Sequence, residues 1–312
     1  MPSDSAFVQS ALRGVAVGLL TPFDAEGEID HRKLRENAEE LGDRDIQTFL
    51  ATANISEYHA LSREERIAVV EKSVEALPAE ACVLAGTGGA TDEAKNLIRA
   101  YDKIGVDAMM IMPPDHTYVH EQGLLGYYRK LGETAESPLV PYIRGFVPSV
   151  SFLVELTNLD PVAGIKYALP DPSILGAAID AGQDDVVWIN GLAEPYAVPF
   201  WAVGAEGFSA GVSNFRPIVG LSLFEALNFG EWGRARELAA MCVPFQQFRD
   251  EAGHASQIEG GVSVPAVKKA LELAGLFGGR VREPLVELTA AEERRVESLY
   301  ATLDERIEAV IS

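Results

Sequence analysis

Short apolar runs alternate with amphipathic segments along the first two thirds of the chain. Each run is almost continuously apolar, as expected of a parallel strand that is covered on both faces. The pattern predicts eight strands, at residues 14–20, 46–52, 82–85, 108–112, 139–143, 162–166, 186–190 and 207–210.

The segments between these runs carry helix signals. Asp30 precedes a helical segment at 30–41, and Ser62 with Glu65 forms a capping box at the start of 62–77. Further helices are expected at 91–104, 121–134, 149–157, 171–181 and 194–203. A repeat of roughly 25–30 residues over eight units predicts an α/β fold of the (β/α)8 TIM barrel type. A doubly wound sheet would also alternate, but no Gly-x-Gly-x-x-Gly follows an early strand.

The pattern changes beyond Pro217. Helical segments are expected at 217–229, 232–250, 264–276 and 290–311, and no further strand is predicted. We therefore expect a barrel domain at residues 1–217, with catalytic residues at its strand ends, and a C-terminal helical segment at 218–312 that packs on the barrel.

Polar residues follow the predicted strands at their carboxyl ends, where barrels of this type place their active sites. They are Thr21, Asn54, Ser56, Glu57, Thr87, Asp115, His116, Tyr118, Tyr142, Arg144, Lys166, Asn190, Glu194, Ser209, Ser213 and Asn214.

Lys166 ends the sixth predicted strand and is the only lysine between Lys130 and Lys268. Apolar walls would disfavour its charged form, and a neutral amine is a nucleophile toward carbonyls. The alternative is a lysine that begins a surface loop.

Tyr142 on the adjacent strand suggests a mechanism for such an amine. Lys166 would add to the ketone of a 2-oxo acid, and the phenol would move protons through the carbinolamine. The iminium would then permit proton loss, C–C cleavage or loss of a leaving group. Arg144 or the turn at 54–57 could bind the carboxylate beside the ketone. On spacing alone, Tyr142 fits a buried structural tyrosine and Arg144 a surface ion pair equally well.

Four stretches match a known family: Gly18-Leu-Leu-Thr-Pro-Phe-Asp24, Leu84-Ala-Gly-Thr-Gly-Gly89, Pro141-Tyr142 and Gly164-Ile-Lys166. The chain resembles the dihydrodipicolinate synthase and N-acetylneuraminate lyase family of Schiff-base barrels over nearly its whole length. Tyr142-Ile-Arg-Gly145, Asn214-Phe-Arg-Pro217 and Gly279-Arg-Val-Arg-Glu-Pro-Leu285 resemble the 5-dehydro-4-deoxyglucarate dehydratase branch. The resemblance implies that Lys166 forms the Schiff base, that Tyr142 moves protons, and that the protein is a homo-oligomer, a dimer or homotetramer.

The turn after the second strand departs from the family pattern. The family has Gly-Thr-Thr-Gly-Glu or Gly-Thr-Gly-Glu there, whereas this chain has Ala53-Asn-Ile-Ser-Glu57. Hydroxyls that bind the substrate carboxylate are therefore missing at Asn54 and Ile55. The Asn54 amide, the Ser56 hydroxyl and backbone N–H groups are expected to replace them.

We expect a lyase that acts on a 2-keto-3-deoxy sugar acid, first of all a dehydratase, with or without decarboxylation. The predicted substrate-binding residues are Asn54, Ile55, Ser56, Arg144, Asn190, Ser209 and Asn214, of which Ser209 or Asn214 would orient the departing hydroxyl. The alternatives are an aldolase that releases pyruvate, dihydrodipicolinate synthase itself, and a barrel that binds a sugar acid without turning it over.

The net charge and the placement of the histidines indicate which partners and metals the protein is not expected to bind. The net charge of −21 disfavours nucleic acid and anionic membranes. Scarce lysine in a broadly acidic chain indicates a halophilic cytoplasm, with an ordinary acidic protein as the alternative. His116 and His120 have the i, i+4 spacing of a helical metal pair, but they lie in a Pro-led loop, so we expect neither metal nor cofactor.

The cysteines and the expected lack of a targeting signal both indicate the cytoplasm. Cys82 and Cys242 have no metal-ligand spacing and are expected to be buried free thiols. We expect no signal peptide and no apolar run of the roughly 18 residues that a membrane helix needs. The expected location is the cytoplasm.

Overall fold

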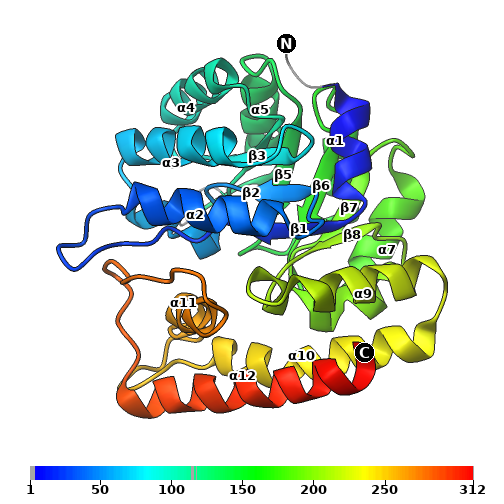
Figure 1. Cartoon of the computed structure of the whole chain (residues 1–312). Coiled ribbons are helices and arrows are strands. Elements are labelled where there is room, and N and C mark those ends of the chain that lie inside the picture. The colour runs from blue at the N-terminus through cyan, green and yellow to red at the C-terminus, as the bar shows by residue number, and fades with distance from the viewer. Residues whose placement is uncertain (1–3, 114–115, 117, 312) are drawn as a thin grey trace.

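A computed structural model describes residues 4–113, 116 and 118–311, and its centre is a closed barrel of eight parallel strands in chain order (Figure 1). The barrel confirms the predicted (β/α)8 fold. Its strands are β1 (Val15–Gly18), β2 (Thr48–Leu50), β3 (Cys82–Thr87), β4 (Ala108–Ile111), β5 (Leu139–Ile143), β6 (Gly164–Tyr167), β7 (Val187–Asn190) and β8 (Gly207–Ser209).

The outer ring consists of helices that follow the strands. They are α2 (His31–Gly42), α3 (Arg63–Ala76), α4 (Thr91–Ile104), α5 (Glu121–Gly132), α6 (Val150–Thr157), α7 (Pro172–Ala181), α8 (Ala197–Trp201) and α9 (Pro217–Asn228). The Asp30 side chain caps α2, and Ser62 and Glu65 form the predicted capping box of α3. The segment expected as one helix at 194–203 instead begins with a 3-10 turn, Glu194–Tyr196, before α8.

Helix α1 (Ser5–Leu12) was not predicted from the sequence. It packs against β3 and β7, and the Thr48 hydroxyl donates a hydrogen bond to the Ala11 carbonyl oxygen. A side chain at Gly164 would clash with Leu12, because an added Cβ would lie 2.5 Å from Leu12 Cδ1. The short stripe of Val8, Ala11 and Leu12 is thus buried against one end of the barrel.

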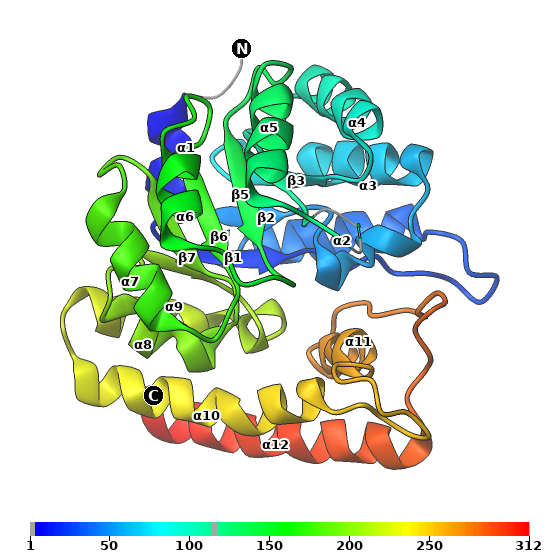
Figure 2. The same ribbon diagram turned by 180° about the vertical axis from the view of Figure 1, so that it is seen from behind.

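The last three helices are α10 (Trp232–Asp250), α11 (Ser263–Leu273) and α12 (Ala290–Ile311). Figures 1 and 2 show them together on the side of the molecule away from α1. Helix α11 contacts the 3-10 turns that follow β2 and β8, so these helices cover the carboxyl end of the barrel. The division into a barrel domain and a tail at residue 217 stays a prediction, and α9, which begins there, packs against β1.

The apolar core has an inner and an outer layer. Leu50, Leu84, Met110, Val140 and Val187 form the inner layer within the barrel. Their neighbours along the strands belong to the larger layer between strands and helices. Cys82 and Cys242 are buried and free, as predicted. Across the described residues, no helix has the length and apolar character needed to cross a bilayer.

Candidate active site

Lys166 and Tyr142 face each other across neighbouring strands. β5 and β6 are paired so that Tyr142 is opposite Lys166. Successive side chains of a strand point to opposite faces. Because Ile165 and Tyr167 pack in the outer layer, Lys166 points into the barrel. The Lys166 Nζ lies 4.5 Å from the centroid of the Tyr142 ring, and the two residues are only 6% and 3% exposed.

The surroundings of this pair change both pKa values. Burial lowers the pKa of Lys166, and the positive charge of Arg144 lowers it further, whereas Tyr142 acts in the opposite direction. Burial alone would raise the pKa of Tyr142, but the charges of Lys166 and Arg144 outweigh it and lower that pKa. Arg144 Nη1 also donates a hydrogen bond of 3.2 Å to the Tyr142 hydroxyl. The amine therefore loses its proton more readily than an ordinary lysine, and the phenol can exchange protons beside it.

A cavity of about 200 Å³ opens over this pair. It is smaller than the roughly 300–1,000 Å³ of pockets for drug-sized ligands, which suits a small acid. Its lining residues are Gly18, Leu50, Ala53, Asn54, Ile55, Tyr142, Arg144, Lys166, Gly191, Ser209, Ala210, Arg249, Ser263 and Val264. Among the described residues that line the cavity, three are basic, Arg144, Lys166 and Arg249, and none is acidic. The cavity therefore favours an anion, although the chain as a whole is strongly acidic.

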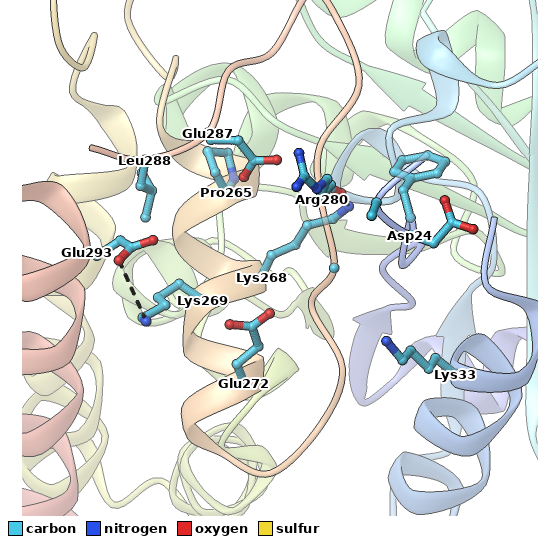
Figure 3. Close-up of a pocket in the computed structure, with 13 residues that line it drawn as sticks. Asp24, Lys33, Pro265, Lys268, Lys269, Glu272, Arg280, Glu287, Leu288 and Glu293 are labelled. Atoms are coloured by element: carbon cyan, nitrogen blue, oxygen red, sulfur yellow. Dashed lines mark hydrogen bonds and ion pairs between the residues drawn. The ribbon is translucent and has the colours of Figure 1, made fainter. Parts of the chain in front are cut away.

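Another hollow, of about 440 Å³, lies beside α11. Figure 3 shows side chains that line it, from α11, from α2 and from the segment around Arg280. Its lining mixes basic residues such as Lys33 and Lys269 with acidic ones such as Glu272 and Glu293. It contains neither Lys166 nor Tyr142, so the smaller cavity is the candidate active site.

The turn after β2 supplies one wall of the cavity. Asn54 and Ile55 line it, and the Asn54 side-chain oxygen is buried without a hydrogen-bond partner. A hydrogen bond from Asn54 also lowers the pKa of Tyr142. Gly18 leaves room for Ile55, because an added Cβ would lie 2.4 Å from Ile55 Cγ2.

Three of the predicted substrate-binding residues do not line the cavity. The Ser56 hydroxyl donates to the Leu19 carbonyl oxygen and accepts from the Ala53 N–H, so it ties its turn to the segment after β1. Asn190 donates to the Ala193 carbonyl and accepts from the Leu192 N–H. The Asn214 oxygen accepts from the Gly18 N–H, and its amide nitrogen is buried without a partner. A role for these three in substrate binding stays a prediction.

Most of the other polar strand-end residues hold loops together. The Thr21 hydroxyl donates to the Ser56 carbonyl, and the Thr87 hydroxyl donates to the Ala94 carbonyl. Glu194 accepts hydrogen bonds from the backbone N–H groups of residues 211–213 and from the Ser213 hydroxyl. These contacts hold the loops at the rim of the barrel.

The loop after β4 does not contribute to the cavity in the described part of the chain. His116 is exposed, and Tyr118 is 83% exposed. His116 Nδ1 accepts from the Tyr118 N–H, and His120 Nδ1 accepts from the Gln122 N–H at the start of α5. Asp115 lies outside the described residues. Within the described ranges, no group of three or more His, Cys, Asp or Glu side chains could hold a metal ion.

Sequence reasoning missed Arg249, Ser263 and Val264, which come from α10 and α11. Arg249 continues the buried stripe of α10, which runs through Ala235, Leu238, Cys242 and Phe245 at spacings of three and four. An arginine that continues an apolar stripe is a signal of a charge that the protein partly covers, as Arg249 is here. Its place in the cavity depends on how α10 docks, which the sequence does not show.

Comparison with known proteins agrees with this geometry. The model of the dihydrodipicolinate synthetase family matches residues 11–303. A probable 5-dehydro-4-deoxyglucarate dehydratase of Streptomyces avermitilis is 30% identical over 93% of this chain and 87% of its own length. The 4-hydroxy-tetrahydrodipicolinate synthase of Methanoculleus marisnigri is 29% identical over 91% of this chain and 96% of its own.

Solved structures show the same architecture. Dihydrodipicolinate synthase from Oceanobacillus iheyensis superimposes with a TM-score of 0.91 at 30% identity, covering 97% of this chain and all of the other. The sialic acid aldolase of Ruminococcus gnavus shares the fold with a TM-score of 0.87 at 21% identity, covering 96% of this chain and 99% of that one. The resemblance found in the sequence is thus confirmed. The chain belongs to the dihydrodipicolinate synthetase family and is a lyase of the class I type, which works through a lysine imine.

Proposed function

We propose that Lys166 forms the imine and that the enzyme dehydrates a 2-keto-3-deoxy sugar acid, as a 5-dehydro-4-deoxyglucarate dehydratase does. The observation that carries this proposal is the buried Lys166 amine, which lies 4.5 Å from the Tyr142 ring centroid in a cavity lined by basic residues. Several curated relatives of similar length carry the dehydratase name, which supports the choice of reaction.

The reaction begins when the neutral amine of Lys166 attacks the ketone carbon. A carbon–nitrogen bond forms, and Tyr142 passes a proton to the carbinolamine oxygen, which leaves as water. The protonated imine draws electrons from carbon 3, whose proton passes to the Tyr142 phenolate left by the first step, and an enamine forms. The enamine then expels the hydroxyl of carbon 4, which takes the proton from Tyr142 and leaves as water. Hydrolysis finally frees the product and the amine.

Other residues that line the cavity are candidates for binding the substrate carboxylate and for orienting the departing hydroxyl. In the proposed mechanism the turn at Asn54 and Ile55 and Arg144, all of which line the cavity, bind the carboxylate beside the ketone. Ser209 lines the cavity at the end of β8, and it is our candidate for orienting the departing hydroxyl.

Borohydride trapping tests the proposal. Incubation with pyruvate followed by reduction should add the mass of one reduced imine to the intact protein. Lys166→Ala should abolish this gain, whereas Lys130→Ala, which removes an exposed lysine on α5, should retain it. Absence of a mass gain with every 2-oxo acid would favour a barrel that only binds its ligand.

Product analysis then separates the reactions that share the imine. A panel of 2-keto-3-deoxy acids should yield dehydrated oxo acids, with or without carbon dioxide. Release of pyruvate would instead identify an aldolase, because the same lysine and tyrosine also serve C–C cleavage.

A further inference from the structure

Glu194 binds the backbone at the point where strand β8 stops being part of the barrel. The last hydrogen bond that ties β8 to its neighbour runs from the Ala210 N–H to the Ala16 carbonyl oxygen. The next three N–H groups, those of residues 211–213, donate to the Glu194 carboxylate over 2.8–3.1 Å. The Ser213 hydroxyl adds a fourth donor at 2.6 Å. One side chain therefore fixes the whole loop after β8.

The burial of Glu194 makes this contact rigid. Its side chain comes from the 3-10 turn after β7 and is 0% exposed. A buried carboxylate is costly unless donors satisfy it, so loss of these donors would be strongly unfavourable. The preceding Ala193 has φ of 65° and ψ of −173°, a conformation that is almost confined to glycine and persists only where the surroundings fix it.

Gly211 leaves room for Glu194 and for Arg249 on the same side of the loop. An added Cβ at Gly211 would lie 2.8 Å from Glu194 Oε2 and 2.9 Å from Arg249 Nη1. Arg249 is partly buried, and burial lowers its pKa, whereas the negative charges of Glu194 and Asp250 act to raise it. Because Arg249 lines the cavity, Glu194 lies behind two parts of the cavity wall.

Ser209 is the part of this wall that can contact a substrate hydroxyl. Phe208 packs in the outer layer, so strand alternation points Ser209 into the barrel, where it lines the cavity. In the described part of the chain, the Ser209 hydroxyl has no hydrogen-bond partner, so it is available to a ligand. Only Ala210 separates Ser209 from the loop that Glu194 fixes, and a shift of that loop would move Ser209 as well.

We propose that Glu194 is a positioning residue for the dehydration step, because its carboxylate fixes the loop after β8 and so places Ser209 against the departing hydroxyl. This inference rests on the proposed function. Glu194 is not among the residues that line the cavity, so it acts through the loop and not on the substrate. Imine formation depends on Lys166 and Tyr142, on strands β6 and β5, and does not require the loop.

The variant Glu194→Gln tests this inference. The glutamine amide would turn an N–H₂ group toward the donors of the loop, which should displace the loop. We expect kcat for dehydration of 5-dehydro-4-deoxyglucarate to fall roughly 10–100-fold, as a misplacement of about 1 Å can cause. Borohydride trapping of pyruvate should keep its half-saturating concentration, because pyruvate has no hydroxyl to lose.

Glu292→Gln is the matched control. The Glu292 carboxylate also accepts hydrogen bonds from two backbone N–H groups, of His254 and Thr289, and from one hydroxyl, that of Thr289. None of these residues lines the cavity. Glu292→Gln should therefore retain both the turnover and the trapping of the wild-type protein.

A double variant tests whether Glu194 acts through Ser209. Effects of independent sites multiply in kcat, whereas effects that share one route do not. If Ser209 is that route, Glu194→Gln/Ser209→Ala should be no slower than the slower of the two single variants. Gly211→Ala is a second approach should Glu194→Gln not fold, because it keeps the carboxylate but crowds its contact with the loop. It should show the same loss of turnover with pyruvate trapping intact.

The outcomes distinguish this inference from the proposed function. An unchanged kcat in the variants that fold, or equal losses of turnover and pyruvate trapping, would overturn the role of Glu194 while the imine chemistry stands. Losses that multiply in the double variant would overturn the route through Ser209. Failure of the wild-type protein to trap pyruvate, or trapping without dehydration, would instead remove the proposed function and this inference with it.

Discussion

Glu57 Oε1 lies 2.6 Å from Lys268 Nζ, and both side chains are almost completely buried. Glu57 directly follows the turn Asn54–Ser56 and has a left-handed backbone conformation with φ of 59°. Lys268 comes from α11 and also donates to the Thr21 and Arg280 carbonyl oxygens. Figure 3 shows it pointing from α11 toward the segment that carries Arg280. The ion pair thus connects the C-terminal helices to the wall of the active site.

Removal of one partner of this pair should destabilise the protein strongly. Lys268→Met leaves the Glu57 carboxylate buried without its cation, and such changes cost about 3–5 kcal/mol. Urea unfolding followed by circular dichroism measures this loss. The double variant Glu57→Gln/Lys268→Met should recover part of it, because no unpaired charge remains.

The neighbouring Lys269 provides the control for this measurement. Its amine pairs with Glu297 at the surface, so Lys269→Met should change the free energy of unfolding by less than about 1 kcal/mol. A Lys268→Met protein as stable as Lys269→Met would show that the buried pair does not hold α11 against the barrel.

Tyr142 should be needed for turnover and dispensable for folding. Tyr142→Phe keeps the ring beside Lys166 but removes the group that carries protons, so kcat should fall roughly 10²–10⁴-fold. Tyr167→Phe is the matched control on the adjacent strand, because the Tyr167 hydroxyl is buried in the outer layer without a hydrogen-bond partner. Steady-state kinetics with a 2-keto-3-deoxy acid gives both values. Similar losses in the two variants would contradict a proton-transfer role for Tyr142.

The pH dependence of imine formation should report the environment of Lys166. The rate rises as the amine loses its proton, and burial lowers the pKa of Lys166 below the ordinary value of about 10.4. Trapping with pyruvate should therefore reach its plateau below that pH. Arg144→Gln removes a charge that lowers the pKa, so the profile should move to higher pH. Arg129→Gln, an exposed change on α5, should leave it in place; an equal shift in both variants would argue against a specific effect of Arg144.

The lowered pKa of Lys166 also makes the stability of the folded protein depend on pH. Its pKa is lower in the folded protein than in the unfolded chain, so the folded state binds this proton less tightly. The contribution of Lys166 to stability is fully present above the ordinary lysine pKa and is lost as the pH falls through the lowered one. The Lys166 amine is therefore a source of instability at neutral pH, which accords with the catalytic role proposed for it.

The barrel and the pair of Tyr142 and Lys166 within it could be predicted from the sequence, because both depend on local patterns along the chain. Continuously apolar strands gave the fold, and strand alternation with parallel pairing brought Tyr142 and Lys166 together. Arg249 could not be placed in the same way, because its position depends on the packing of α10 over the barrel. Ser56 was predicted to bind substrate, but its hydroxyl bonds to the backbone of its own turn at Ala53 and of the segment after β1 at Leu19. Hydrogen bonds of this kind are decided by loop geometry, which residue type alone does not determine.

The dependence of Tm on salt concentration tests whether the acidic surface is an adaptation to a saline interior. A net charge of −21 produces self-repulsion that salt screens, since the Debye length falls from about 10 Å at 0.1 M to about 3 Å at 1 M. If the chain is adapted to a saline interior, screening worth about 2 kcal/mol would raise Tm by roughly 4–8 °C between low and molar potassium chloride.

The shape of that curve identifies its cause. Screening should give most of the rise below about 0.5 M, because the Debye length shortens most steeply there. Preferential exclusion of salt would instead continue to stabilise the protein at higher concentration. The buried Glu57–Lys268 pair is shielded from solvent, so Lys268→Met should lower Tm by a similar amount at every salt concentration. Full stability of the wild-type protein at low salt would refute the halophilic interpretation and leave an ordinary acidic protein.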